Sequence, residues 1–385
     1  MPVAPYGSWK SPIGASLVAS AGVRLDALQA DGPDLYWLEG RPTEGGRNVL
    51  VRHGAGAVTP EGFNVRTRAH EYGGGACTVH RGTAYFCNYG DQRLYRQRPG
   101  ERPQPITPEA EARYADACVT ADGRLLICVR ERHETGKEAI NELVFLPTDG
   151  TKPPAVIAAG YDFYSSPRLS PDGQHLAWLC WNHPNMPWDG TELWRAGFGA
   201  RGVWGEVRRV AGGRDESIFQ PDWSTTGRLF YVSDRDGWWK LYYEDRRDQP
   251  VVDMEAEFGR PQWVFGERAY AFLPDGRIAA AYTQDGFDHL LFDRPAGPLA
   301  ARRLAVHQHC PTADGLGQAA GVHRRRTCRG QRHRGAGPGD RCDRGHQARL
   351  RRADRSRLCL AATRHLLPDC FRNPHPALSR CGRRG

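Results

Sequence analysis

A histidine followed by a run of glycines is the first candidate for chemistry in this sequence. In "HEYGGGA", His70 precedes Gly73, Gly74 and Gly75, and this pattern mimics the oxyanion loops of esterases. Such a loop acts only beside a nucleophilic serine on a G-x-S-x-G turn, and that pentapeptide occurs nowhere in the chain. The sequence therefore favours a structural role, in which the glycines let backbone segments approach closely near the centre of the fold.

Cysteines and histidines near the C-terminus are the second candidate, because thiolates and imidazoles bind zinc. The six cysteines beyond Leu304 are Cys310, Cys328, Cys342, Cys359, Cys370 and Cys381. They are spaced by 18, 14, 17, 11 and 11 residues and never form a C-x2-C pair. His307 and His309 would share a metal ion only by chance. We therefore assign no catalytic, metal-binding or cofactor-binding residue and expect no cofactor.

The charge divides the chain into a body, residues 1–305, and a tail, residues 306–385. The whole chain of 385 residues carries a net charge of +9. The tail holds 18 arginines, no lysine and five aspartates, a net charge of +13. The body holds 35 basic and 39 acidic residues, a net charge of −4. Tryptophan, tyrosine, isoleucine, lysine, glutamate and methionine are absent after Leu304. The basic average therefore says nothing about a partner of the body.

Cysteine use in the body indicates a reducing compartment. Its five cysteines are Cys77, Cys87, Cys118, Cys128 and Cys180, and an odd number spread over a large domain is typical of reduced, buried thiols. The first twenty residues lack a basic segment followed by an apolar one, and no apolar window reaches the length of a membrane span. We expect a soluble cytoplasmic protein with no membrane partner.

The body repeats a unit with a period of 41 to 54 residues, close to that of a four-stranded propeller blade. The six units begin at Val23, His70, Tyr114, Tyr164, Ile218 and Gly259. Even spacing of short strands predicts an all-β propeller. The alternative is a pair of β-sandwiches, an architecture that would not require a repeated unit. The repeat decides for the propeller.

Each unit predicts the same local structure. Tight turns are expected at Ala121-Asp122-Gly123, Pro171-Asp172-Gly173 and Thr225-Thr226-Gly227, where glycine supplies a positive φ. Second strands are expected over residues 125–129, 176–181 and 229–232, and third strands in "TELWRA" from Thr191 and "WWKLYYED" from Trp238. The only helix expected is a short one near "ASLVASAG", from Ala15.

Several longer stretches resemble one known family. They include "FNVRTRAHEYGGGA", "LAWLCWNHPNMPWDGTELW" and "ESIFQPDWSTTGRLFYVSDRDGWWKLYYED". Over residues 5 to 305 the chain is similar to the N-terminal propeller of prolyl oligopeptidase family serine peptidases, of the acylaminoacyl peptidase and dipeptidyl aminopeptidase type. The resemblance implies a seven-bladed propeller that admits short peptides to an α/β-hydrolase domain with a Ser, Asp, His triad. The loop "NHPNMPWDG", from Asn182, would then either line the face toward that domain or pack within its blade, and packing is favoured.

The chain departs from this family after the sixth unit. A seventh unit, a nucleophile elbow and a triad are not found, and too few residues follow Val306 to form a hydrolase domain. We therefore expect the chain to have no peptidase activity as written. The alternative is a non-catalytic propeller that binds a peptide or protein partner. Short peptides are the ligands of the intact relative.

The tail has the composition of out-of-frame translation. Reading GC-rich DNA in a wrong frame yields many Arg, Gly, Ala, Pro, Cys and His codons. Codons exist for Leu358 to Pro374 that encode Y-V-S-R-P-R-A-I-S-F-P-T-A-S-G-T one nucleotide later, which resembles the family's link into the hydrolase domain. A nucleic-acid-binding arm is the weaker alternative, since the tail has one Phe and no Tyr or Trp for stacking.

These observations predict three regions: an N-terminal segment 1–22, propeller blades over 23–305, and a non-native or unstructured tail over 306–385. Six blades built for a ring of seven would leave strand edges and apolar faces uncovered. We therefore expect self-association through the open propeller and no nucleic-acid partner.

Overall fold

The computed structural model describes residues 8, 13–14, 22–246 and 249–293, all within the first of two compact units, Met1–His309. The second unit is Cys310–Gly385. The predicted helix near Ala15 and the tail from Val306 lie outside the described residues.

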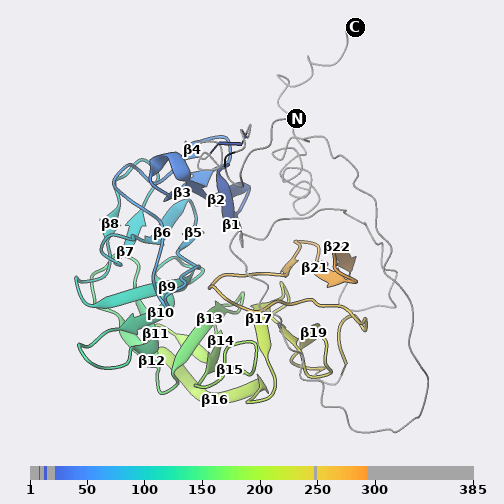
Figure 1. The fold of residues 1–385 in the computed structure, drawn as a ribbon. Helices are drawn as coiled ribbons and strands as arrows, with labels where there is room; N and C mark the ends of the chain where they lie inside the picture. The colour runs from blue at the N-terminus through green and yellow to red at the C-terminus, as the bar shows by residue number, and fades with distance from the viewer. Residues whose placement is uncertain (1–7, 9–12, 15–21, 247–248, 294–385) are drawn as a thin grey trace, which may run out of the picture. The chain divides into compact units, whose positions relative to one another are not determined.

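The described chain folds into six antiparallel sheets that follow one another along the sequence, from blue to orange in Figure 1. Four sheets have four strands and two have three, and in each sheet strands adjacent in sequence are paired. We call the sheets blades 1 to 6.

The strands of blades 1 to 3 are β1 (Arg24–Asp31), β2 (Asp34–Arg41), β3 (Arg47–Arg52), β4 (Gly56–Ala57), β5 (Cys77–His80), β6 (Thr83–Cys87), β7 (Leu94–Gln97), β8 (Gln104–Pro105), β9 (Ala112–Val119), β10 (Leu125–Arg132), β11 (Ile140–Pro147) and β12 (Ala155–Ala158). Those of blades 4 to 6 are β13 (Phe163–Leu169), β14 (His175–Trp181), β15 (Glu192–Gly199), β16 (Gly202–Gly212), β17 (Ile218–Trp223), β18 (Leu229–Ser233), β19 (Lys240–Tyr243), β20 (Tyr270–Phe272), β21 (Ile278–Gln284) and β22 (Phe287–Asp293).

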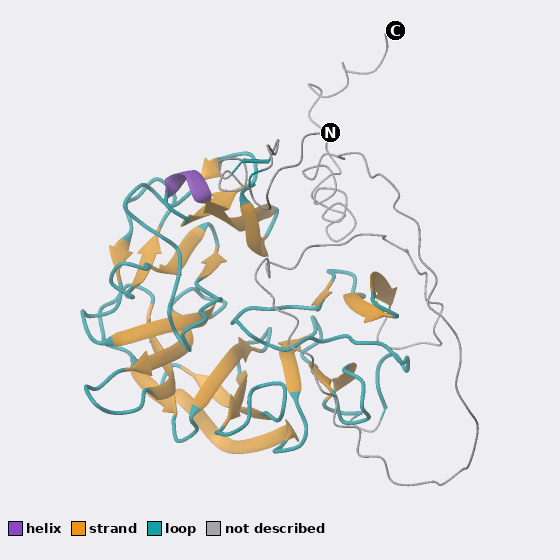
Figure 2. Cartoon of the chain, in the orientation of Figure 1, coloured by secondary structure: helices purple, strands orange, loops and turns teal. Residues whose placement is uncertain are grey.

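The predicted turns and strands are confirmed. Gly123, Gly173 and Gly227 have φ angles of 76°, 70° and 79°, which a side chain adopts only with strain. The second strands β10, β14 and β18 cover the predicted segments. The third strand β15 starts one residue later than predicted, and β19 comprises only Lys240–Tyr243 of the predicted segment from Trp238. Figure 2 shows strands joined by loops, and within the described ranges the one helix is the short 3-10 turn η1 (Pro42–Glu44).

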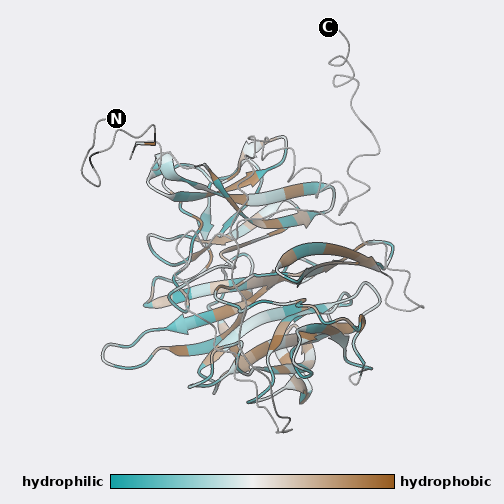
Figure 3. Cartoon of the chain, turned by 45° about the vertical axis from the view of Figure 1, so that its right-hand side comes forward, coloured by the Kyte–Doolittle hydropathy of each residue, from teal (hydrophilic) through white to brown (hydrophobic). Residues whose placement is uncertain are grey.

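Neighbouring blades pack face to face through apolar side chains. Figure 3 shows hydrophobic residues, in brown, along the strands. Five buried hydrophobic clusters occur in the described chain, and each joins two consecutive blades, from the blade 1–2 pair to the blade 5–6 pair. In the cluster between blades 4 and 5, for example, Leu179 and Leu193 pack with Ile218 and Tyr231. The fold is therefore the predicted all-β propeller of six blades, with its core between the blades.

The first strands of successive blades share a bulge. We call the first strand of each blade its inner strand. Residues with positive φ interrupt the inner strands at Ala27, Asp116, Ser166 and Gln220, and Gly75 stands at the same place in blade 2. The amide of Asp116 donates to the carbonyl of Gly75 over 2.8 Å, and the amide of Ser166 donates to the Asp116 carboxylate over 2.7 Å. We call this place the bulge position, because hydrogen bonds there join one blade to the next.

Two units begin differently from the sequence prediction. The segment from His70 is a loop until β5 starts at Cys77, and the segment from Gly259 is a loop until β20 starts at Tyr270. The reason is tertiary: these two loops meet, and Gly74 and Phe265 form a parallel bridge.

Candidate functional site

One end of the propeller gathers its long loops. In an antiparallel blade, the loop that enters the first strand and the loop between the second and third strands lie at the same end of the sheet. The loops before β5 and β20, and those between β10 and β11 and between β14 and β15, are of these two kinds. We call this end the loop face, and the candidate "HEYGGGA" residues lie on it.

The glycines of "HEYGGGA" have the structural role that the sequence favoured. The amide of Phe265 donates to the carbonyl of Gly73 over 2.9 Å. A β-carbon on Gly74, whose φ is +88°, would lie 2.6 Å from the backbone nitrogen of Phe265. A β-carbon on Gly75 would lie 2.9 Å from the Phe265 side chain and 3.1 Å from Asp116. Only glycines allow the loop before blade 2 to contact both blade 3 and the loop before blade 6.

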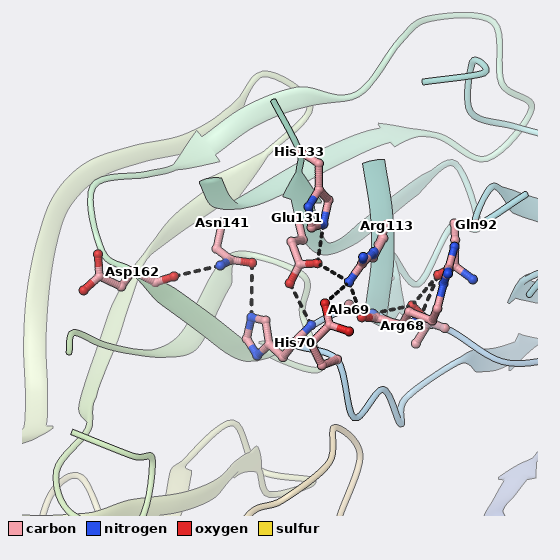
Figure 4. Close-up of polar contacts among 11 residues, drawn as sticks. Arg68, Ala69, His70, Gln92, Arg113, Glu131, His133, Asn141 and Asp162 are labelled. Atoms are coloured by element: carbon pink, nitrogen blue, oxygen red, sulfur yellow. Dashed lines mark hydrogen bonds and ion pairs between the residues drawn. The ribbon is translucent and has the colours of Figure 1, made fainter. Parts of the chain in front are cut away.

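His70 is packed as a neutral ring. Its Nε2 lies 3.1 Å from the Asn141 side-chain oxygen, and its ring contacts Phe163, Trp181 and Phe265 at centroid distances of 5.1, 5.9 and 4.6 Å. Burial lowers the pKa of His70 to about 4, against a smaller opposite effect of the Glu131 carboxylate. Figure 4 shows the contact between the His70 ring and Asn141. A neutral imidazole can donate to this amide oxygen and so position the loop.

A buried carboxylate, Glu131 on β10, organises the polar groups beside His70 (Figure 4). It accepts hydrogen bonds from the His70 amide over 2.7 Å and from Arg113 over 3.1 Å, and it lies 2.7 Å from His133 Nε2. Arg113 also pairs with the exposed Glu71 over 2.6 Å. The donors around Glu131 satisfy its charge, so this group fixes the loop before blade 2 onto blade 3.

An aromatic group stands next to this polar cluster on the loop face. The Trp263 ring lies 4.5 Å from that of Trp188 and 5.7 Å from that of Tyr72, measured between centroids. Tyr72 is 64% exposed, Trp263 is 50% exposed, and Met186 nearby in sequence to Trp188 is 39% exposed. The three rings come from three different loops and form a partly solvent-exposed apolar surface, which we call the aromatic patch.

The loop "NHPNMPWDG" both packs and faces outward. Ser217 donates to the carbonyl of Pro187 over 2.8 Å, and Asn185 donates to the carbonyl of Arg214 over 2.8 Å, so much of the loop fixes blade 4 to blade 5. Trp188 is the exception, because its ring joins the aromatic patch.

Two open hollows lie on blade 4: one of about 410 Å³ at the turn between β15 and β16, lined by Gly199 to Gly202 and Trp204, and a smaller one. The volume of the smaller one is about 170 Å³, and Arg195, Trp204 and Arg208 are among the residues that line it. Both arginines already pair with Glu244. This smaller hollow is below the size of typical ligand sites and its charges are satisfied, so it offers little to a ligand.

The five cysteines of the described chain are not activated as nucleophiles. All five body cysteines are free, and burial raises the pKa of Cys77, Cys87 and Cys118 to about 12 and those of Cys128 and Cys180 still further. Such thiols remain protonated and unreactive at neutral pH. Within the part of the chain that is described, no three His, Cys, Asp or Glu side chains form a metal-ion group, and His307 and His309 lie outside that part. The same part contains no helix long and apolar enough to cross a membrane.

Sequence reasoning did not find the Glu131 cluster or the aromatic patch. Both join loops that are far apart in sequence, and no local pattern marks such contacts. The available signal was the presence of Tyr72 and Trp263, large aromatic residues in loops rich in glycine and charged residues.

Solved structures of other proteins share this fold. The structure matches a puromycin-hydrolysing peptidase from Mycobacterium tuberculosis with 36% sequence identity and a TM-score of 0.72, over 80% of this chain and 50% of that one. It matches puromycin hydrolase with 33% identity and a TM-score of 0.70, over 77% of this chain and 50% of the other. This propeller belongs to the prolyl oligopeptidase family.

A more distant member of the prolyl oligopeptidase family shares the fold. Prolyl oligopeptidase B from Galerina marginata matches with 12% identity and a TM-score of 0.53, over 74% of this chain and 44% of that one. The chain spans about half the length of the puromycin-hydrolysing peptidases that it matches. Models of known protein families and curated protein sequences give no match.

Proposed function

We propose that this chain is the substrate-gating part of a prolyl oligopeptidase family serine peptidase that acts on short or N-acylated peptides. The observation that carries the proposal is the match to puromycin-hydrolysing peptidases at 36% identity over 80% of the chain. The loop face, with the aromatic patch and the pinned loops around His70, is the surface that would meet the peptide or the catalytic domain. Specificity of the acylaminoacyl or dipeptidyl type belongs to this proposal.

A domain-exchange experiment tests the gating role. Residues 23–293 would replace the propeller of the Mycobacterium tuberculosis puromycin-hydrolysing peptidase. We expect the chimera to cleave a chromogenic aminoacyl substrate and to leave a folded protein intact. A folded chimera that cleaves folded proteins as readily as peptides would contradict the proposed gating.

The chain itself is proposed to be inactive, since it contains no G-x-S-x-G turn to hold a nucleophile. The purified polypeptide should release no chromophore from aminoacyl or acyl-aminoacyl substrates. Release that a serine-directed inhibitor abolishes would contradict this.

A second candidate function is a non-catalytic propeller that binds a peptide or protein, and the exposed aromatic patch favours it. The DNA separates the two candidates. A downstream frame that encodes G-x-S-x-G supports the peptidase, and its absence supports the binding module.

We further propose that residues 306–385 are translated out of frame and that the protein is cytoplasmic, with neither nucleic acid nor membrane as a partner. The abrupt loss of Lys, Glu, Ile and Tyr after Leu304 supports the frame change. Resequencing the codons for Ala300 to Cys310 tests it, and an unchanged reading frame would contradict it. Nucleic-acid binding with a steep salt dependence that truncation at Val306 removes would contradict the assignment of partners.

A further inference from the structure

Apolar side chains on the first strand of blade 1 are exposed, whereas their counterparts on the first strands of later blades are buried by the preceding blade. Leu25 lies two residues before the bulge position of β1, and 52% of it is exposed. Tyr114, Tyr164 and Ile218 stand at the same place in blades 3, 4 and 5, and all are at least 98% buried. Each is covered because the preceding blade packs on it.

Leu28, one residue after the bulge position, is likewise exposed where its counterparts are buried. It is 54% exposed, whereas its counterparts Ala76, Pro167 and Pro221 in blades 2, 4 and 5 are buried. Val23, the residue immediately before β1, is 50% exposed. Three large apolar side chains thus stand uncovered on or next to one strand. Val49 and Val51, on β3 farther from the centre, are buried, so the uncovered area is the inner part of the blade.

The hydrogen bond that links blades is also missing at this place. In blades 3 and 4 the amide at the bulge position donates to the preceding blade, as Asp116 does to Gly75 and Ser166 to Asp116. The amide of Ala27 donates instead to the carboxylate of its own neighbour Asp26 over 2.7 Å. Blade 1 therefore has both the apolar and the polar features of a face that receives another blade.

Blade 6 offers the complementary face. Side chains of paired residues in an antiparallel sheet point to the same side, so the pairs Ala279–Phe292 and Ala281–Leu290 lie together, opposite the side where Tyr270 and Tyr282 pack on blade 5. Ala271 pairs with Ala279 and is exposed. Five apolar side chains, three of them alanines, lie on this face, and the polar pair Thr283–Asp288 lies at one end of it. Ala279 is buried. The described residues form no buried apolar cluster between blades 6 and 1.

We propose that blade 1 of one chain docks on blade 6 of a second copy, which gives head-to-tail association. The contact continues the interface already repeated between blades within the chain, with Leu25 and Leu28 placed against the alanine-rich face of blade 6. A head-to-tail contact uses two different surfaces, so each bound copy leaves one of them free and further copies can add. The inference rests on the propeller fold and not on the peptidase role.

Sedimentation velocity of the full chain over a range of concentrations tests the association. The wild type should show a mass that rises with concentration beyond that of one chain. Leu25→Ser with Leu28→Ser should weaken the association at least tenfold. Trp204→Ser with Val207→Ser, at side chains 57% and 47% exposed on β16, is the matched control and should associate like the wild type. Circular dichroism melting confirms that each variant is folded.

A mixing experiment tests the direction of the contact. Ala271→Arg blocks blade 6, so it and the Leu25/Leu28 variant should each be monomeric alone, yet form a two-chain species and nothing larger when mixed. A wild type that stays monomeric would mean that this chain covers its own blade 1, and would overturn the proposal. Association that survives in the Leu25/Leu28 variant, or dimers of Ala271→Arg alone, would overturn it too.

Discussion

His70 couples the stability of the propeller to pH. Its pKa is lowered by burial from 6.5 to about 4. Between these values the unfolded chain binds a proton that the folded chain does not. The contribution of His70 to the free energy of unfolding is therefore fully present above pH 6.5 and is lost as the pH falls to about 4. The loss should reach about 3 kcal/mol.

Urea unfolding at a series of pH values checks this for the wild type and His70→Gln, which keeps a donor for Asn141. The variant should lose the part of the pH dependence that His70 supplies. His53→Gln, at an exposed side chain, is the matched control. Equal pH profiles for the wild type and His70→Gln would refute the assignment.

A position can require glycine because its φ is positive or because a β-carbon would collide with a neighbour, and Gly74 and Gly100 distinguish these two reasons. Gly74 and Gly100 have φ angles of +88° and +76°, but only Gly74 has backbone where a β-carbon would stand. Gly100→Ala should cost about 1 to 2 kcal/mol for the left-handed conformation. Gly74→Ala should cost at least about 2 kcal/mol more, because Phe265 must move. Similar losses in denaturant melts of the two variants would show that the contact is not tight.

The elements are held together by side chains at the bulge position. Gln220 accepts hydrogen bonds from the amides of Ala269 and Tyr270 over 2.5 and 3.2 Å, and it donates to the carbonyl of Tyr270 over 2.7 Å. One side chain thus fixes blade 6 to blade 5. The inner strands need such groups, because each bulge removes backbone pairing within the blade.

Gln220→Ala should therefore lower the free energy of unfolding by about 2 to 4 kcal/mol, since buried amide and carbonyl groups lose their partners. Hydrogen exchange should accelerate in β20 to β22 before it does in β9 to β11. Gln174→Ala, at an exposed turn side chain, should leave both rates unchanged. Uniform acceleration across all blades would argue against a local link.

At the scale of the whole molecule, stability should decrease from the middle blades to the ends. Blades 2 to 5 each take part in two of the five apolar clusters, whereas blades 1 and 6 take part in one. A repeat protein stabilised by nearest-neighbour contacts frays where a neighbour is missing. Native-state hydrogen exchange at low protein concentration should protect β10 and β14 most, and β2 and β21 least. Equal protection of all blades would indicate a closed ring.

The sequence was sufficient for what repeats locally. The turns at Gly123, Gly173 and Gly227 and the strands that follow them depend on neighbouring residues, so period and turn chemistry predicted the blades. The late starts of β5 and β20 escaped prediction, because Gly74 and Phe265 meet only after the blades are assembled. The Glu131 cluster escaped for the same reason.

By itself the sequence determined an all-β propeller of six units, the family it resembles and the break in composition after Leu304. Those features depend only on local periodicity and composition. Only the tertiary structure decided that His70 stays neutral, that the aromatic patch forms and that blade 1 exposes Leu25 and Leu28. Burial and exposure depend on which surfaces meet, and that is set by packing between segments far apart in the chain.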